Sequence, residues 1–124
     1  SENKENYFNQ MHSVYMLEEN CQLNIVERFW CATGTHFNNT VSQSLLCRGA
    51  KLTKYTLGSM ASPNERCQNM HTEFIQQKDN SESKLYRFYF SKGKFKSEGT
   101  IRNNILVDFD GVNSKSDTYS ISML

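Results

Sequence analysis

The residues with the clearest catalytic potential in this chain are its three histidines, His12, His36 and His71. An imidazole titrates near neutral pH, so any two of them could act as general acid and general base. Nucleophile motifs do not accompany them, because the chain contains no Gly-x-Ser-x-Gly and no papain-like cysteine setting. Its six glycines stand apart and form no phosphate-binding loop. We therefore expect a protein that is not an enzyme.

A hydrolase of ribonuclease type that uses paired histidines is the enzymatic alternative. The chain length and the position of His12 are similar to those of the pancreatic ribonucleases. However, the second histidine of that family near the C-terminus and its Lys-containing Asn-Thr-Phe segment are both absent. The sequence therefore favours binding over catalysis.

The four cysteines are even in number and fall in the first 67 residues, at Cys21, Cys31, Cys47 and Cys67. They are too widely spaced for a CxxC zinc hook, so we predict two disulfides in an oxidising compartment, with three pairings open. Asn38-Asn39-Thr40 is an N-glycosylation sequon in an expected turn. The chain also begins without an apolar signal segment, as a processed form would. Together these features predict a secreted, extracellular glycoprotein with Asn38 as the acceptor.

No metal or cofactor site is expected. Asp108, Asp110 and Asp117 supply only part of the calcium-loop pattern. Asp110-Gly111 is better explained as a tight hairpin turn.

A basic and aromatic segment covers residues 84–102. Its cations alternate with Tyr and Phe, which is typical of a surface for glycosaminoglycan or another anion. Lysines beside an aromatic strand also protect a sheet edge from other chains, and we favour that explanation. We do not expect nucleic acid as a partner. The residues of this candidate patch are Lys84, Arg87, Lys92, Lys94, Lys96 and Arg102.

Aromatic residues make up 12% of the chain and could line an interior that holds a small apolar or amine-like ligand. The alternation in residues 85–90 predicts that Tyr86, Phe88 and Phe90 point inward. Leu85 and Tyr89 would then be partly exposed beside Arg87, forming a face for an extracellular protein partner. The candidate ligand-binding residues are Phe29, Trp30, Tyr55, Phe88, Phe90 and Tyr119, and Ile105, Val107 and Ile121 are further inward candidates.

The pattern of apolar residues predicts one N-terminal helix followed by seven to eight strands. Residues 4–19 carry Tyr7, Met11, Val14 and Tyr15 at helical spacing. Alternating or aromatic segments at 21–31, 41–47, 51–57, 67–76, 85–90, 95–98, 101–109 and 119–123 predict strands joined by short links.

These elements predict a β-rich α+β fold in a single domain, residues 1–124. Sequential strands with hairpin-length links indicate an antiparallel meander. It would close as a small lipocalin-like barrel or curl as an open cystatin-like sheet, although the Gly-x-Trp and Gln-x-Val-x-Gly motifs of those families are absent. No internal repeat is evident, and we expect neither a solenoid nor a membrane span.

We therefore expect a secreted, disulfide-stabilised binding protein. Its ligand would be a small molecule in an aromatic interior or a protein on a sheet face. The ribonuclease-type hydrolase and the anion-binding module of residues 84–102 are the alternatives. The sequence leaves the oligomeric state open.

Overall fold

The computed structural model describes residues 6–30, 35–60, 67–91 and 99–123. These residues form eight strands and no helix. The strands are β1 (Asn6–Leu17), β2 (Gln22–Trp30), β3 (Thr35–Leu46), β4 (Lys51–Met60), β5 (Cys67–Gln77), β6 (Glu82–Ser91), β7 (Gly99–Phe109) and β8 (Lys115–Met123).

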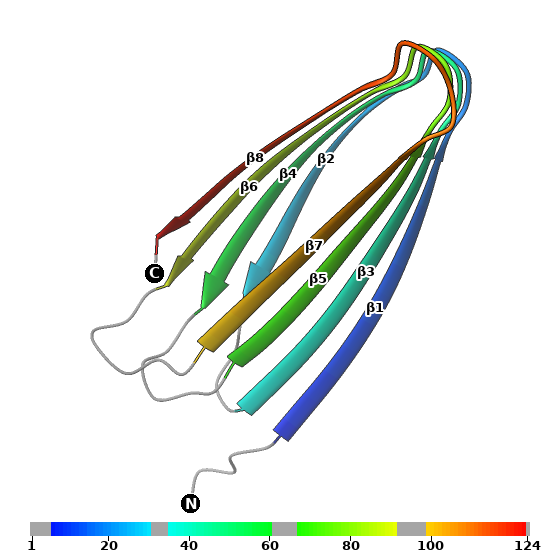
Figure 1. Ribbon diagram of the computed structural model, residues 1–124. Coiled ribbons are helices and arrows are strands. Elements are labelled where there is room, and N and C mark those ends of the chain that lie inside the picture. The colour runs from blue at the N-terminus through cyan, green and yellow to red at the C-terminus, as the bar shows by residue number, and fades with distance from the viewer. Residues whose placement is uncertain (1–5, 31–34, 61–66, 92–98, 124) are drawn as a thin grey trace, which may run out of the picture.

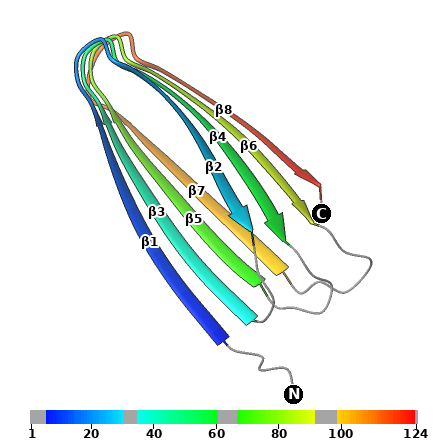
Figure 2. The same ribbon diagram turned by 180° about the vertical axis from the view of Figure 1, so that it is seen from behind.

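The strands form two parallel four-stranded sheets that lie face to face. Sheet A has the order β1-β3-β5-β7 and sheet B the order β2-β4-β6-β8. Each odd strand passes through a short corner into the next even strand, which lies in the opposite sheet (Figure 1). The chain thus builds four β-arches, stacked in register with all corners at one end (Figure 2).

The corners repeat one backbone conformation. Asn20, Gly49, Asn80 and Asn113 each have a positive φ, at a spacing of roughly 30 residues that is typical of solenoid repeats. Asparagine and glycine are the residues that adopt this left-handed conformation most readily. The amide of each of the first three donates to a carbonyl oxygen of the next corner, over 2.9–3.0 Å. The hydrogen-bond ladders of both sheets therefore continue around the bend.

The predicted N-terminal helix over residues 4–19 is wrong, because Asn6–Leu17 is strand β1. Both faces of this strand carry apolar residues. Leu17 is buried between the sheets and Tyr15 half-buried, whereas Val14 and Met16 are exposed on the outer face. Apolar residues on both faces of a strand can give i, i+4 and i+7 spacings without a helix.

The predicted antiparallel meander is also wrong, and with it the barrel and the curled sheet. Strands were expected at Val41–Cys47 and Lys51–Leu57, and β3 and β4 occupy these segments. The short link between them does not make a hairpin. It leads the chain across the interior, so each strand pairs in parallel with the strand two positions away in sequence. Sequence analysis also missed the repeat, because the four arches share few residue identities.

The interior is apolar near the corners of the first two arches, whereas the polar residues Gln77, Ser81 and Ser83 are buried beside the third corner. The apolar part is a cluster of Leu17, Leu46, Ala50, Leu52, Ile75 and Leu85. Burial of these side chains is the main contribution to the stability of the stack. Beyond this cluster the inward positions carry charged and polar side chains, which form the site described next.

A membrane-spanning helix is absent from the described residues.

Candidate functional site

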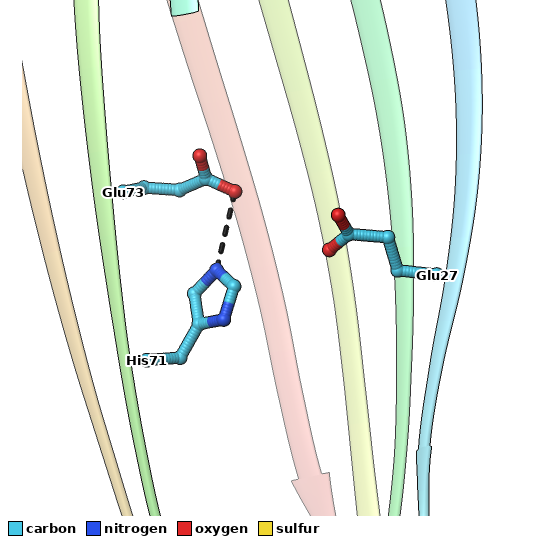
Figure 3. Close-up of side chains that lie close together, drawn as sticks. All are labelled: Glu27, His71 and Glu73. Atoms are coloured by element: carbon cyan, nitrogen blue, oxygen red, sulfur yellow. Dashed lines mark hydrogen bonds and ion pairs between the residues drawn. The ribbon is translucent and has the colours of Figure 1, made fainter. Parts of the chain in front are cut away.

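The most unusual group of side chains is an ionic cluster buried between the two sheets. Sheet B contributes Glu27 from β2, Lys54 from β4 and Arg87 from β6, and β5 of sheet A contributes His71 and Glu73. Lys54, Glu73 and Arg87 are each 1% exposed. Figure 3 shows Glu27 facing His71 and Glu73 across the interior. Alternation along the strands places all five on inward positions.

Glu73 is the centre of this cluster. Its Oε1 accepts hydrogen bonds from Nζ of Lys54 at 2.5 Å and from Nε2 of His71 at 3.2 Å, and Nη2 of Arg87 lies 3.8 Å away. Burial alone raises the pKa of Glu73, but the His71 hydrogen bond and the Lys54 charge outweigh it, so the pKa lies below its ordinary value. Glu73 is therefore ionised at neutral pH.

Lys54 bridges two carboxylates that come from different sheets. Its Nζ lies 3.0 Å from Oε1 of Glu27, 3.0 Å from Oγ of Ser42 and 5.6 Å from the centre of the Tyr15 ring. The charges of Lys54 and Arg87 balance those of Glu27 and Glu73. Each of these cations therefore has a carboxylate partner, and a buried ionic network is tolerated only when its charges are paired in this way.

Glu27, His71 and Glu73 resemble a set of metal ligands, because one ligand atom from each lies within 4.8 Å of the others. The donor set does not fit a metal, however. The Lys54 ammonium already lies between the two carboxylates. A divalent ion there would have to displace it and also meet the charge of Arg87. The arrangement holds the sheets together, and solvent has little access to it.

The second notable feature is a ladder of tyrosines on the outer face of sheet B. Register places Tyr55, Tyr86 and Tyr119 side by side. Their ring centres are 5.1 and 5.2 Å apart, and the rings are stacked within 12° of parallel. Residues that the strand register aligns across a sheet form a column. Phe88 and Ile121 lie in the column next to the tyrosines and are 36% and 53% exposed. This face therefore presents an ordered apolar and phenolic surface to solvent.

The outer face of sheet A carries a shallow groove of about 590 Å³ that crosses all four strands. Apolar side chains contribute most of its lining. They include Val14, Met16, Leu45, Phe74 and Leu106.

Three of the predicted ligand-binding residues do not line an interior. Tyr55, Phe88 and Tyr119 lie on the outer face of sheet B, and Tyr55 and Tyr119 are 41% and 56% exposed. The predicted alternation in residues 85–90 was inverted, because Leu85, Arg87 and Tyr89 are the buried set. Further inward candidates divide between the faces, since Ile105 and Val107 pack on the core and Ile121 faces outward. The side chains of Phe29, Trp30 and Phe90 lie outside the described residues.

The structure does not bring His12 and His71 together. His12 is exposed on the outer face of β1, where its Nε2 lies 2.8 Å from Oε1 of Gln43. His71 points into the interior from β5. The two rings therefore lie on opposite faces of sheet A, and the side chain of His36 lies outside the described residues.

The predicted anion-binding patch loses its central member. Arg87 is buried and pairs with Glu73, so its guanidinium does not reach the surface. Lys84 is exposed on β6 and Arg102 on β7, which belong to different sheets. Lys92, Lys94 and Lys96 lie outside the described residues.

The predicted disulfides are not supported. Cys21 and Cys47 are both free thiols, whereas Cys31 and the side chain of Cys67 lie outside the described residues. Both thiols lie at corners, where the backbone hydrogen bonds of the stack already hold the chain. Neither of these two cysteines therefore has the structural role that the sequence predicted.

The predicted glycosylation of Asn38 has no support from its position. Asn38 lies within β3 rather than in a turn. Alternation places it on the same face as the buried Thr40 and Ser42, and its Oδ1 accepts a hydrogen bond from Asn9. A glycan is normally attached to an accessible loop.

No protein-family model, curated protein or solved structure matches this chain.

Proposed function

We propose that this protein is a non-catalytic binding module that contacts a partner protein through the outer face of sheet B. The observation that supports this proposal is the ladder of Tyr55, Tyr86 and Tyr119 beside Phe88 and Ile121. Tyrosine is enriched at protein interfaces because it combines a large apolar area with a polar tip. Stacking within the ladder also limits the motion that binding would otherwise have to restrict.

The interior does not favour the alternative of a buried small ligand. Leucine and isoleucine side chains fill it near the first two corners, and Gln77, Ser81 and Ser83 fill it at the third. Farther from the corners it is occupied by the ionic cluster around Glu73. A partner on a sheet face is therefore the better of the two binding hypotheses. Secretion of the protein is a separate prediction, and the proposed function does not depend on it.

A matched pair of variants tests the proposal. Tyr86→Lys places a charge in the middle of the ladder on central strand β6. Thr72→Lys places the same charge on the outer face of sheet A, on central strand β5. Immobilised wild-type protein and both variants are exposed to an extract of the natural source, and the retained proteins are quantified by mass spectrometry.

We expect at least one protein to be retained by the wild type and by Thr72→Lys but lost with Tyr86→Lys. Hydrogen exchange of the purified complex should then show protection in β4, β6 and β8. Retention of the same proteins by all three samples, or protection confined to sheet A, would contradict the proposed face.

A further inference from the structure

The two ends of the stack differ from its middle in one respect, which is the exposure of large apolar side chains. Among the described residues, only Tyr55, Phe74 and Phe88 are exposed in the two middle arches. The first and last arches hold all the others, namely Phe8, Met11, Val14, Met16, Leu23, Val26, Leu106, Phe109, Val112, Tyr119 and Ile121. Most of these side chains lie on the outer faces and lack a neighbouring strand on one side, so they are more exposed than Tyr55, Phe74 and Phe88 of the middle arches. Exposed apolar surface at an open edge is typical of interfaces between tightly associated subunits.

The inward columns show the same effect. Register aligns Tyr15, Ser44, Ile75 and Val107 in one column. Ser44 and Ile75 in the middle arches are buried, whereas Tyr15 and Val107 at the ends are only half-buried. In sheet B, Ile25 at the end is likewise half-buried, next to the fully buried Lys54. Another arch at each end would complete the burial of these columns.

The strand edges at the two ends are also open among the described residues. In the sheet order, β1 and β2 lie at one end and β7 and β8 at the other, each with one neighbour. Half of the backbone N–H and C=O groups of such a strand have no partner strand, so it is a template for further pairing. All strands of a sheet run in one direction, so the last arch of one molecule can accept the first arch of another without reversal.

We propose that copies of this chain associate head to tail, with β7 and β8 of one molecule pairing in parallel with β1 and β2 of the next. If the register continues, Leu106 faces Val14 in sheet A and Tyr119 faces Val26 in sheet B. Asn104 meets His12, and Asp117 meets Asn24, so the strand ladders bring together no like charges. This association goes beyond the proposed partner on the sheet face, because it uses the edges of the sheets and not that face.

One like-charge contact remains at the corners. Within the molecule, Lys78 forms an ion pair with Asp110 of the next arch, and Arg48 pairs with Glu19. The same spacing would place Asp110 near Glu18 of the following molecule. Glu18→Lys should therefore tighten association by about two- to five-fold, the range expected for an exposed ion pair. Looser association in this variant would count against the proposed register.

The main test uses variants that block one end at a time. Val14→Lys with Val26→Lys alters the first arch, and Leu106→Lys with Tyr119→Lys alters the last arch. Lysine on an edge strand discourages pairing. The control is Phe74→Lys with Tyr55→Lys, which places the same charges in the same columns of the middle arches. Circular dichroism verifies that each variant is folded, and sedimentation velocity measures its assembly over a wide range of protein concentration.

We expect the wild type and the control to form oligomers that lengthen with concentration, because head-to-tail contacts do not close. Each blocked variant alone should associate at least about ten-fold more weakly, which corresponds to roughly 1.4 kcal/mol. An equimolar mixture of the two blocked variants should form a dimer and stop there, because only one pair of unaltered ends remains.

Two results would overturn the proposal. One is a wild-type protein that stays monomeric at all concentrations, because the open ends would then not recognise a second copy. The other is a blocked variant that dimerises by itself, because this would show symmetric pairing of two identical ends.

Discussion

Nζ of Lys54 lies 2.5 Å from Oε1 of Glu73 although the two residues belong to opposite sheets. Both side chains are 1% exposed, so the ion pair crosses the interior away from solvent. A buried pair of this kind contributes little net stability over an apolar pair of the same shape, but the loss of one partner is costly. The pair therefore favours the arrangement in which Lys54 of β4 and Glu73 of β5 meet between the two sheets.

Lys54→Met should destabilise the protein by about 3–5 kcal/mol, because it leaves Glu27 and Glu73 buried without their shared cation. Equilibrium urea unfolding at neutral pH measures the change. Lys84→Met is the matched control, since Lys84 is exposed on the outer face of β6 and its removal should change stability by less than about 0.5 kcal/mol. Equal effects of the two substitutions would show that the buried pair has no structural role.

Acid should weaken the fold through Glu73. Its pKa in the folded state lies below the ordinary value of 4.5, because the His71 hydrogen bond and the Lys54 charge outweigh the effect of burial. The stability linked to this group is complete above pH 4.5 and is lost as the pH falls through the folded-state pKa. In Glu73→Gln, the free energy of unfolding should be lower at neutral pH and should change less steeply with pH below 4.5.

Glu19→Gln is the control for this acid series. Glu19 forms an exposed ion pair with Arg48, so its removal should leave the slope below pH 4.5 nearly unchanged. If the free energy of unfolding falls equally steeply below pH 4.5 in Glu73→Gln and in the wild type, Glu73 is not the source of the acid dependence.

Local sequence pattern predicted many of the strands but not how they assemble. Alternation and β-branched or aromatic content identified the strands around Val41–Cys47 and Ile101–Phe109. The chain turns at Gly49 and at Asp110-Gly111, as expected. The hairpin predicted at Asp110-Gly111 is wrong, however, because β7 and β8 lie in different sheets and this turn is a corner between them. A short turn does not reveal whether the next strand pairs beside the first or crosses to another sheet. That choice depends on contacts among all four arches, which one sequence does not display.

The inverted alternation in residues 85–90 has a similar cause. Tyr86 and Phe88 form the more apolar set, so hydrophobicity alone directs them inward, yet Arg87 is buried. The guanidinium is tolerated because Glu73 of the opposite sheet lies within reach. Lys54 and Glu27 were missed for the same reason. The recurrence of asparagine or glycine at the four corners could have revealed the repeat, and aligning the chain on these positions brings Val26, Tyr55, Tyr86 and Tyr119 together.

The corner at Gly49 should accept asparagine better than valine. Its φ is +72°, and the equivalent residues of the other corners are asparagines with φ near 60°. A Cβ at Gly49 would lie 2.2 Å from Oδ1 of Asn20, but that side-chain end can rotate away. We expect Gly49→Val to cost roughly 1–3 kcal/mol and Gly49→Asn clearly less, as measured by thermal unfolding. Equal costs would show that the contact with Asn20, and not the backbone conformation, requires glycine.

Gly58 should not tolerate even a methyl group, because the ring of Tyr89 covers it. A Cβ at Gly58 would lie 2.4 Å from Cδ1 of Tyr89. Overpacking of this kind costs about 1–3 kcal/mol. A double-mutant cycle checks the cause, since Gly58→Ala should cost less in a Tyr89→Ala background than in the wild type. Additive effects of the two substitutions would place the strain elsewhere.

Alkaline pH should destabilise the protein through Tyr89. Burial raises the pKa of its phenol, and the charge of Glu73 adds to this effect, while Arg87 and the hydrogen bond to Asn103 oppose it. In the unfolded chain the phenol ionises near its ordinary value of 10.0. The unfolded state therefore releases a proton that the folded state retains, and stability falls as the pH rises above 10.0.

Tyr89→Phe removes the hydrogen bond to Asn103, so it should lower the free energy of unfolding by about 0.5–1.5 kcal/mol at neutral pH. Above pH 10.0 the stability of this variant should decline less steeply than that of the wild type. Tyr119→Phe is the control, since it removes a phenol from the exposed ladder instead of the interior, and its slope should follow that of the wild type. If the slope of Tyr89→Phe also follows the wild type, the alkaline loss does not come from the buried phenol.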